Sequence, residues 1–334
     1  SLVFATDSGL GILAKSFFDH GILTDVMVVR HGRHETHDAW YPGALQITNL
    51  RDPGQIIRAK GFCATMDAML FFETPFLFEL YPFCREHGIP TVLMPMYECC
   101  LEYPPYQPDT YLCPSLLDLQ VFRKKWPQMP AEFIPVPVEV PWRQRTRAEV
   151  FVHNAGHGGL KGRNGTSELL QALQWVRSPA RFIIRSQHDR VEVPGNLPKH
   201  LDIDWRLGRT ASNIWEEGDV FVWPHHWDGL SLPLQEARAA GMLVMSTDRF
   251  PDNTWLPQEP LIQVREYRKT RIGPPYNEIN EAIVDPRAIA AKIDEVYGTD
   301  ISEYSLAGKQ WAEENSWEIL GPKYREFLEK WMTQ

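Results

Sequence analysis

The sequence has few cysteines, and none of them stand at metal-ligand spacing. The five are Cys63, Cys84, Cys99, Cys100 and Cys113, an odd number with no C-x-x-C motif. Neither a disulfide framework nor a structural zinc site is indicated. Such cysteine usage is typical of a reducing compartment, so we expect a cytoplasmic protein.

Long hydrophobic runs and an excess of basic residues are also absent. No segment approaches the roughly 18 apolar residues of a membrane-spanning helix, and no basic leader precedes the first apolar run at 2–5, so we expect no integral membrane segment. The net charge of −9 argues against a sequence-independent nucleic-acid binder, which needs a broad basic field. A local basic groove stays compatible with this charge.

The chain of 334 residues, 43% of them hydrophobic, is long enough for about two domains. In its first third, short apolar runs alternate with helical patterns, which predicts β-α units and a parallel sheet. The expected strands lie at 2–5, 25–29, 67–72, 91–96 and 110–114, and the expected helices at 11–21, 76–88 and 115–126.

Closely spaced prolines at 135, 137 and 141 mark the expected domain boundary, because proline continues neither a helix nor a central strand. The β-α pattern then restarts, with strands at 149–154, 181–186 and 219–224 and helices at 166–176, 211–218 and 232–240. We expect an N-terminal Rossmann-like domain at 1–135, a linker at 136–148, a second Rossmann-like domain at 149–315 and a final helix at 316–334 that packs back on the first domain.

Two loops of the second half suit a phosphate group. Residues 224–231 lead from a strand into a helix that begins near Pro233, and Gly229 lets the backbone approach closely. Anions bind at such a point because free N–H groups and the helix dipole favour negative charge. The glycine-rich loop at 154–165 carries Lys161 and Arg163, two cations that could surround a phosphate. A plain strand-turn-helix and a solvated loop are the alternative interpretations.

Residues 227–248, WDGLSLPLQEARAAGMLVMSTD, resemble the donor-site signature of retaining glycosyltransferases of family four, E-G-F-G-L-P-x-x-E-A-x-A-x-G-x-P-V. Asp228 precedes Glu236 by the spacing of the two signature acids. Asp228 replaces the usual Glu, and Leu243 stands where Pro is usual. The resemblance continues in order through residues 7–11, 112–126, 133–140 and 151–164.

The resemblance implies an α/β protein of the GT-B fold, with two Rossmann-like domains whose parallel sheets face across a cleft and a C-terminal helix that crosses back to the first domain. The second domain would hold a nucleotide-diphosphate sugar, with a UDP-sugar favoured, and the first would present a hydroxyl acceptor. Neither a metal nor another cofactor would be required.

The resemblance also implies roles for single residues. Lys161 and Arg163 would neutralise the departing diphosphate, Asp228 would hold hydroxyls of the donor sugar, and Glu236 would accept hydrogen bonds from the ribose. The family's usual Arg, five residues before the Lys, is Gly156 here. Arg163 would substitute for it, or the diphosphate would be held differently. Further donor contacts would come from Gly9, Gly11, Gly229, Leu230, Ser231 and, near the base, Arg185.

Acceptor contacts are less sharply indicated. Tyr97 and Glu98 follow an expected strand, and they could contact the sugar or acceptor or simply cap that strand. His31 and His34 follow another strand and could face the acceptor. A zinc site at His34 and His37 is a less favoured alternative.

We therefore expect a hexosyltransferase-type glycosyltransferase that retains the anomeric configuration by front-face attack. The favoured acceptor is a saccharide or a lipid-linked sugar. A hydroxymethylated base in DNA is a minority option, drawn from the basic runs at 30–34 and 143–147. A protein of the same fold that uses a phosphorylated sugar, and a catalytically impaired nucleotide-sugar-binding protein, are the alternatives.

Overall fold

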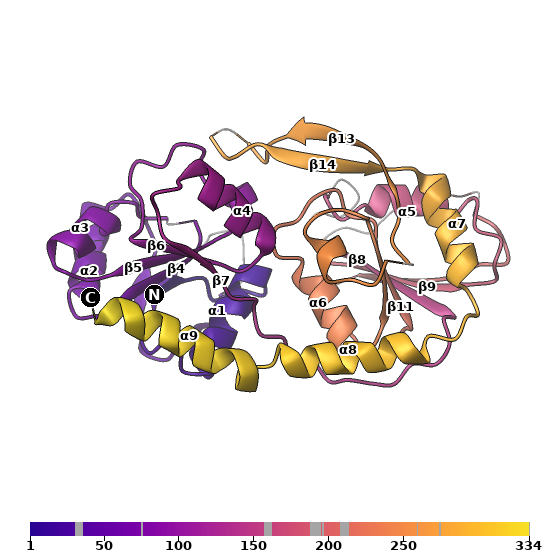
Figure 1. Cartoon of the computed structure of the whole chain (residues 1–334), viewed down its shortest axis with the longest axis horizontal. Coiled ribbons are helices and arrows are strands. Elements are labelled where there is room, and N and C mark those ends of the chain that lie inside the picture. Colours follow the sequence, from indigo (N-terminus) through magenta and orange to yellow (C-terminus); the bar gives the residue numbers. More distant parts are fainter. Residues whose placement is uncertain are drawn as a thin grey trace. The chain divides into compact units, whose positions relative to one another are not determined.

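The computed structural model describes residues 1–30, 36–74, 76–156, 162–187, 195, 197–207, 214–258, 260–273 and 275–333. The chain forms two compact units (Figure 1). The first comprises Ser1–Pro137, Arg271–Glu278 and Trp317–Gln334, and the second comprises Val138–Thr270 and Ile279–Ser316. The chain therefore enters the first unit three times.

A seven-stranded parallel sheet, in the order β3-β2-β1-β4-β5-β6-β7, forms the centre of the first unit. Strands β4 to β6 are almost continuous apolar runs with nearly every residue buried, which is the pattern of parallel strands covered on both faces. The strands are β1 (Leu2–Val3), β2 (Met27–Val29), β3 (Leu45–Ile47), β4 (Met69–Glu73), β5 (Thr91–Pro95), β6 (Thr110–Cys113) and β7 (Ala131–Phe133).

Side-chain caps fix where helices of the first unit begin. The Ser8 hydroxyl accepts from the Gly11 amide at the start of α1, and the Ser115 hydroxyl accepts from the Asp118 amide at the start of α4, both at 3.1 Å. Each cap satisfies an N–H group that has no partner within its helix. The helices that follow the strands are α1 (Gly9–Asp19), α2 (Pro53–Cys63), α3 (Leu80–Glu86) and α4 (Leu116–Lys125).

The last helix, α9 (Trp317–Met332, yellow in Figure 1), also belongs to the first unit. Phe17 of α1 meets Trp317 and Tyr324 edge to face, with ring centroids 5.0 and 4.8 Å apart. The Tyr324 hydroxyl donates to the Pro135 carbonyl at 3.0 Å. The expected return of the final helix to the first sheet is thus found.

A five-stranded parallel sheet, in the order β10-β9-β8-β11-β12, forms the centre of the second unit. Alternate residues face opposite sides: Phe151 and Phe182 pack with α5 and α7, whereas Val152 and Ile183 pack with α6. The strands are β8 (Val150–Gly156), β9 (Arg181–Ser186), β10 (Asp202–Leu207), β11 (Val220–Trp223) and β12 (Leu243–Ser246), and the helices are α5 (Thr166–Ala172), α6 (Leu232–Ala239), α7 (Pro286–Val296) and α8 (Ser302–Glu314).

An antiparallel hairpin of β13 (Val264–Thr270) and β14 (Ile279–Val284) also belongs to the second unit, while its loop, Arg271–Glu278, belongs to the first. Within the first unit, Arg271 pairs with Glu102 at 2.6 Å, and Lys125 donates to Asn277 at 2.7 Å. The hairpin was not expected from the sequence.

The expected α/β class with two parallel sheets is confirmed. Helix α2 and strands β3, β7 and β10 are additions to the expected elements. Residues 214–218 form turns rather than the expected helix at 211–218, whose remaining residues lie outside the described ranges. Among the described residues, no helix combines the length and the apolar character needed to cross a membrane.

Candidate functional site

Two loops of the second unit leave the carboxyl ends of the neighbouring strands β8 and β11. The amide of His226 in the second loop donates to the carbonyl of Arg163 in the first at 2.7 Å. Loops separated by about 60 positions in sequence are therefore joined directly. The carboxyl edge of a parallel sheet is where α/β proteins commonly bind ligands.

Gly165 is needed for this junction. Its φ of +72° is a left-handed conformation, and a Cβ atom there would lie 2.0 Å from the Pro224 carbonyl oxygen. The neighbouring Asn164 side chain donates to the Ala155 carbonyl at 2.9 Å, which fixes the loop to the end of β8. Only glycine allows the backbones to approach this closely.

Arg163 and Asp228 form an ion pair across the two loops. Arg163 Nη2 lies 3.8 Å from Asp228 Oδ1, and the guanidinium stacks on the Trp227 ring at 4.6 Å. Burial opposes ionisation of Asp228, but Arg163, His225, the Ser231 amide and Arg249 outweigh it and lower the pKa of this carboxyl. The site thus keeps a carboxylate and a partly exposed guanidinium next to each other.

A buried polar network supports the Asp228 backbone. Arg249 Nη1 lies 3.1 Å from both the Asp228 carbonyl and Asp252 Oδ2, and His225 Nε2 lies 3.0 Å from the same Asp252 oxygen. All three side chains of the network are almost fully buried. A buried polar network of this kind makes its surroundings rigid. Removing one of its members would leave the others buried without a partner.

The start of α6 carries a buried hydroxyl that has no hydrogen-bond partner among the described residues. Ser231 caps the helix with a φ of +52°, which is rare outside glycine, and its Oγ is this hydroxyl oxygen. The Gln235 amide holds the preceding Leu230 carbonyl at 2.6 Å. A helix start with an unused donor suits an anion. The Ser231 amide itself, an expected phosphate contact, donates to the Asp228 carboxylate in this structure.

Glu236 projects from the same helix and accepts a hydrogen bond from the Trp215 indole N–H at 3.1 Å. Burial raises the pKa of Glu236 to about 7, and the indole contact offsets part of this effect. The side chain stays partly exposed, so the carboxyl can reach a ligand. At neutral pH, Glu236 is therefore poised between its neutral and ionised forms.

Arg185 lies at the carboxyl end of β9, next to β8, and is 5% exposed. Its Nη2 lies 3.5 Å from Glu217, while its Nη1 makes no hydrogen bond to any residue that the structure describes. Burial and the neighbouring Arg206 lower its pKa. An orphaned N–H donor in a buried guanidinium favours a carbonyl or anionic ligand at this position.

The expected first-unit residues occupy two separate places. Gly9 and Gly11 lie in the first turn of α1, and a Cβ at Gly11 would come within 2.1 Å of the Thr6 carbonyl oxygen. Tyr97 and Glu98 lie in a short 3₁₀ turn after β5, where the Tyr97 hydroxyl donates to the Glu278 carbonyl at 2.5 Å and Glu98 is 4% exposed. Their acceptor role stays a prediction.

Glu98 has a buried acidic neighbour. Burial and the nearby Glu98 raise the pKa of Asp118 to about 8, although Ser115 and the Tyr97 amide donate to it. Asp118 stabilises the turn after β5, because its carboxyl accepts from the Tyr97 backbone amide at 2.9 Å.

Lys161, His31 and His34 lie outside the described residues. His37, from the same histidine-rich stretch, pairs with Asp7 at 2.6 Å and stacks on Trp40 at 4.6 Å. Over the part of the chain that the structure describes, no three potential metal-binding side chains gather in one cluster.

Several contacts that support the site were not predicted from the sequence. His226 bridges Glu168 of α5 and Glu281 of β14 at 3.2 and 3.1 Å. Burial alone would lower the pKa of His226, but the two carboxylates have the larger effect and raise it. No local pattern signals this bridge, whereas Arg249 and Asp252, in the polar loop after a buried strand, could have been identified as candidates.

Comparisons with known proteins agree with this architecture. No family model and no curated protein match the sequence. Among solved structures, HepE of Anabaena in complex with UDP and glucose is similar, with 10% identity over 98% of this chain and 99% of that chain and a TM-score of 0.65.

Two further structures are similar at the level of the fold. Sucrose-phosphate synthase of Thermosynechococcus elongatus has 14% identity, coverage of 96% and 92%, and a TM-score of 0.60. A ugt transferase of Siraitia grosvenorii in complex with UDP has 12% identity, coverage of 100% and 99%, and a TM-score of 0.54. These likenesses show that the chain has the GT-B fold that its sequence indicated.

Proposed function

We propose that this protein is a glycosyltransferase that moves a sugar from a nucleotide-diphosphate sugar, favoured to be a UDP-sugar, to a hydroxyl acceptor. The observation that carries the proposal is the junction of the two loops, which brings Arg163 and Asp228 together beside the start of α6. The Ser231 hydroxyl at that helix start, which has no partner within the described part of the chain, supports an anionic ligand. The HepE and Siraitia structures are complexes that contain UDP, which supports a uridine nucleotide here as well.

In this proposal the diphosphate lies against Arg163, the start of α6 and Lys161. Negative charge develops on the diphosphate as the bond to the sugar opens, so these cations stabilise the transition state more than the ground state. Asp228 holds hydroxyls of the donor sugar. Its ion pair with Arg163 aligns the sugar-binding group with the phosphate-binding group, because each fixes the other's position.

Glu236 and Arg185 hold the nucleoside end. The Glu236 carboxylate accepts hydrogen bonds from the two ribose hydroxyls, and Nη1 of Arg185 donates to a carbonyl oxygen of the base. Their helix and strand are rigid elements of one unit, which favours precise placement of the donor.

Front-face attack with retention fits this arrangement. The acceptor oxygen bonds to the anomeric carbon while the bond from that carbon to the phosphate oxygen breaks, its electron pair passing to the diphosphate. The departing phosphate takes the acceptor's hydroxyl proton, so no protein carboxylate needs to act as nucleophile, unlike in retaining glycosidases. Neither a metal nor another cofactor takes part in this proposal.

A saccharide or a lipid-linked sugar is the proposed acceptor. The DNA alternative drew on the basic runs at 30–34 and 143–147. Residues 31–34 lie outside the described residues. In the second run, Arg145 is 2% exposed, and its guanidinium donates to the Gly218 carbonyl at 2.8 Å and the Trp215 carbonyl at 2.5 Å. A buried guanidinium cannot contact phosphate. Arg145 therefore stabilises the second unit instead.

A donor and acceptor screen read by mass spectrometry tests the function. We expect a mass increase of one sugar on an acceptor, together with release of UDP. Glu236→Ala should reduce UDP binding and transfer, whereas Glu216→Ala, at an exposed site on the neighbouring turn, should not. UDP binding without transfer or hydrolysis of any donor would identify the impaired binding protein instead, and transfer unaffected by Glu236→Ala would refute the donor site.

A further inference from the structure

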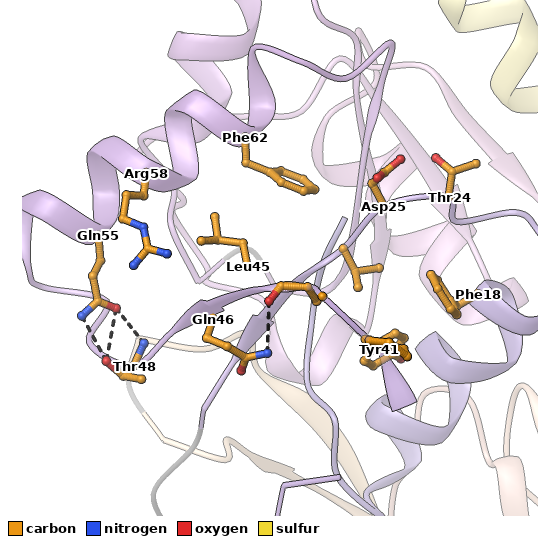
Figure 2. Close-up of a pocket in the computed structure, with 14 residues that line it drawn as sticks. Phe18, Thr24, Asp25, Tyr41, Leu45, Gln46, Thr48, Gln55, Arg58 and Phe62 are labelled. Carbon is orange, nitrogen blue, oxygen red and sulfur yellow. Dashed lines mark hydrogen bonds between the residues drawn. The ribbon is translucent and has the colours of Figure 1, made fainter. Parts of the chain in front are cut away.

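The first unit contains a pocket of about 650 Å³ at the β3 edge of its sheet (Figure 2). Strands β2, β1 and β4 separate β3 from β5, the strand that precedes the Tyr97 turn. The pocket lies beside helix α2, the segment before β2 and the segment before β3. Its volume is within the usual range of about 300 to 1,000 Å³ for small-molecule sites. Its lining includes Phe18, Asp25, Tyr41, Leu45, Arg58 and Phe62.

The walls of this pocket are held in place by contacts of their own. The side-chain oxygen Oε1 of Gln55 accepts from the Thr48 and Asn49 backbone amides at 2.7 and 3.1 Å, which ties α2 to the end of β3. On the other side, Phe18 and Tyr41 meet edge to face with ring centroids 5.0 Å apart. The cavity is therefore largely preformed, which reduces the entropy lost when a ligand binds.

Two opposite charges flank the pocket without meeting. Figure 2 shows Arg58 of α2 and Asp25 on opposite sides of Phe62. Both residues are exposed, and neither side chain makes an ion pair or a hydrogen bond with the described residues. Because the Gln55 amide is already engaged at both its oxygen and its nitrogen, these two charged groups are the strongest polar groups left for a ligand.

These features select the chemistry of the ligand. A carboxylate accepts hydrogen bonds only, and a guanidinium donates only. An anion would be attracted by Arg58 but repelled by Asp25. A cation would be attracted by Asp25 but repelled by Arg58. A neutral polyol can donate to one group and accept from the other, while the apolar faces of a sugar ring can rest on Phe62 and Leu45.

We propose that this pocket binds a neutral saccharide unit. The proposal rests on the proposed function in one respect: the saccharide is taken to be a remote unit of the acceptor or product chain, bound by the first unit away from the reacting hydroxyl. Remote binding of this kind positions a substrate without taking part in the chemistry. A longer saccharide acceptor should then be used better than a monosaccharide.

Saturation-transfer difference NMR on the full chain tests the proposal with methyl α-glucoside, maltose and lactose as neutral probes and glucose 1-phosphate as an anionic one. We expect saturable binding of at least one neutral probe, and about a fivefold or greater loss of its affinity in both Arg58→Met and Asp25→Asn, since each loses a hydrogen bond to a charged group. Arg51→Met and Asp67→Asn, exposed positions outside the pocket lining, should bind as the unchanged protein does.

The sign of the Asp25→Asn effect distinguishes the ligand classes. Weaker binding of the neutral probe supports the proposal, whereas stronger binding of glucose 1-phosphate with no binding of neutral probes would overturn it in favour of an anion site. Binding of no probe, or binding that both pocket variants leave unchanged, would overturn it too. UDP binding measured on the same proteins separates failure of the pocket proposal from failure of the proposed function. The pocket variants should keep their affinity for UDP, and Glu236→Ala should keep its affinity for the neutral saccharide probe.

Discussion

Arg163 and Asp228 form an ion pair of 3.8 Å between two loops that follow neighbouring strands, and Trp227 stacks on the guanidinium. The pair divides the proposed donor into two parts, a diphosphate next to the cation and a sugar next to the carboxylate. Removing one member should therefore affect nucleotide and sugar differently.

Arg163→Met should weaken UDP binding by roughly 10- to 100-fold, because a hydrogen bond to a charged group contributes about 1.5–3 kcal/mol. Asp228→Asn should leave UDP affinity unchanged or increase it, since the Asp228 carboxylate no longer competes with the phosphate for Arg163, while hydrolysis or transfer from the UDP-sugar falls. Isothermal titration with UDP and a donor-hydrolysis assay measure the two effects, with Arg287→Met as a control on α7. Equal losses of UDP affinity in both variants would contradict the division.

Glu236, with a pKa of about 7, should make nucleotide binding depend on pH. The ionised carboxylate is the form that accepts from the ribose, so UDP affinity should rise as the pH increases through 7 and be roughly tenfold higher at pH 8 than at pH 6. Binding should also release a proton, which calorimetry in buffers of different ionisation enthalpy detects. Glu236→Gln should flatten the profile, and a profile that this variant leaves unchanged would assign the pH dependence to another group.

The same pKa shift gives the opposite sign for stability. The pKa of Glu236 is raised above its unfolded value, so the group favours the folded state at acid pH and this contribution is lost as the pH rises through about 7. Glu236→Gln should therefore be more stable than the unchanged protein at pH 8 and similar to it at pH 4.5. Thermal unfolding at the two pH values, with Glu216→Gln as the control, measures the difference. Functional groups held in an unfavourable environment commonly lower the stability of the folded protein.

The local parts of this fold could be predicted, and the parts that depend on distant contacts could not. The turn from β11 into α6 is encoded within a few residues by Gly229 and Pro233, and the structure contains it. Strand β10 was missed because its residues are partly exposed at a sheet edge, and the β13–β14 hairpin because the charged, largely exposed β13 carries no core pattern. A hydrophobic period in the sequence indicates burial, and β10 and β13 have few buried residues.

The candidate site was predictable to the same extent. The sequence named Arg163, Asp228 and Glu236 from local spacing and resemblance. It could not show that the Arg163 carbonyl accepts from His226, or that Arg249 supports the Asp228 backbone, since both contacts join separate loops. In the sequence, Gly165 is one of several glycines in its loop, and nothing distinguishes it from the others. The position of the Pro224 carbonyl in the structure explains why glycine is needed there.

Gly165→Ala should therefore be strongly destabilising. The alanine would have to adopt a φ of +72° with its Cβ 2.0 Å from the Pro224 carbonyl oxygen, so the loop must move. We expect a loss of about 2 kcal/mol or more in the free energy of unfolding, together with weaker UDP binding. Gly61→Ala is the matched control, because that glycine lies in α2 with open space around it, and alanine should be neutral or stabilising there. Urea unfolding of both variants decides the point.

Arg145 provides the last test, because its guanidinium connects separate segments of the second unit. It donates to carbonyls of Arg143, Gly218, Trp215 and Ala240, and burial lowers its pKa to about 10. Arg145→Met removes these donors and leaves the buried carbonyls without partners, at about 1–3 kcal/mol for each that water cannot reach. Urea unfolding should therefore show a loss of several kcal/mol, whereas Arg147→Met, at an exposed pair with Glu149, should change stability by less than about 1 kcal/mol. If instead Arg145→Met kept its stability and lost salt-dependent binding to duplex DNA, the guanidinium would have to leave its site to meet phosphate, and the DNA acceptor would return.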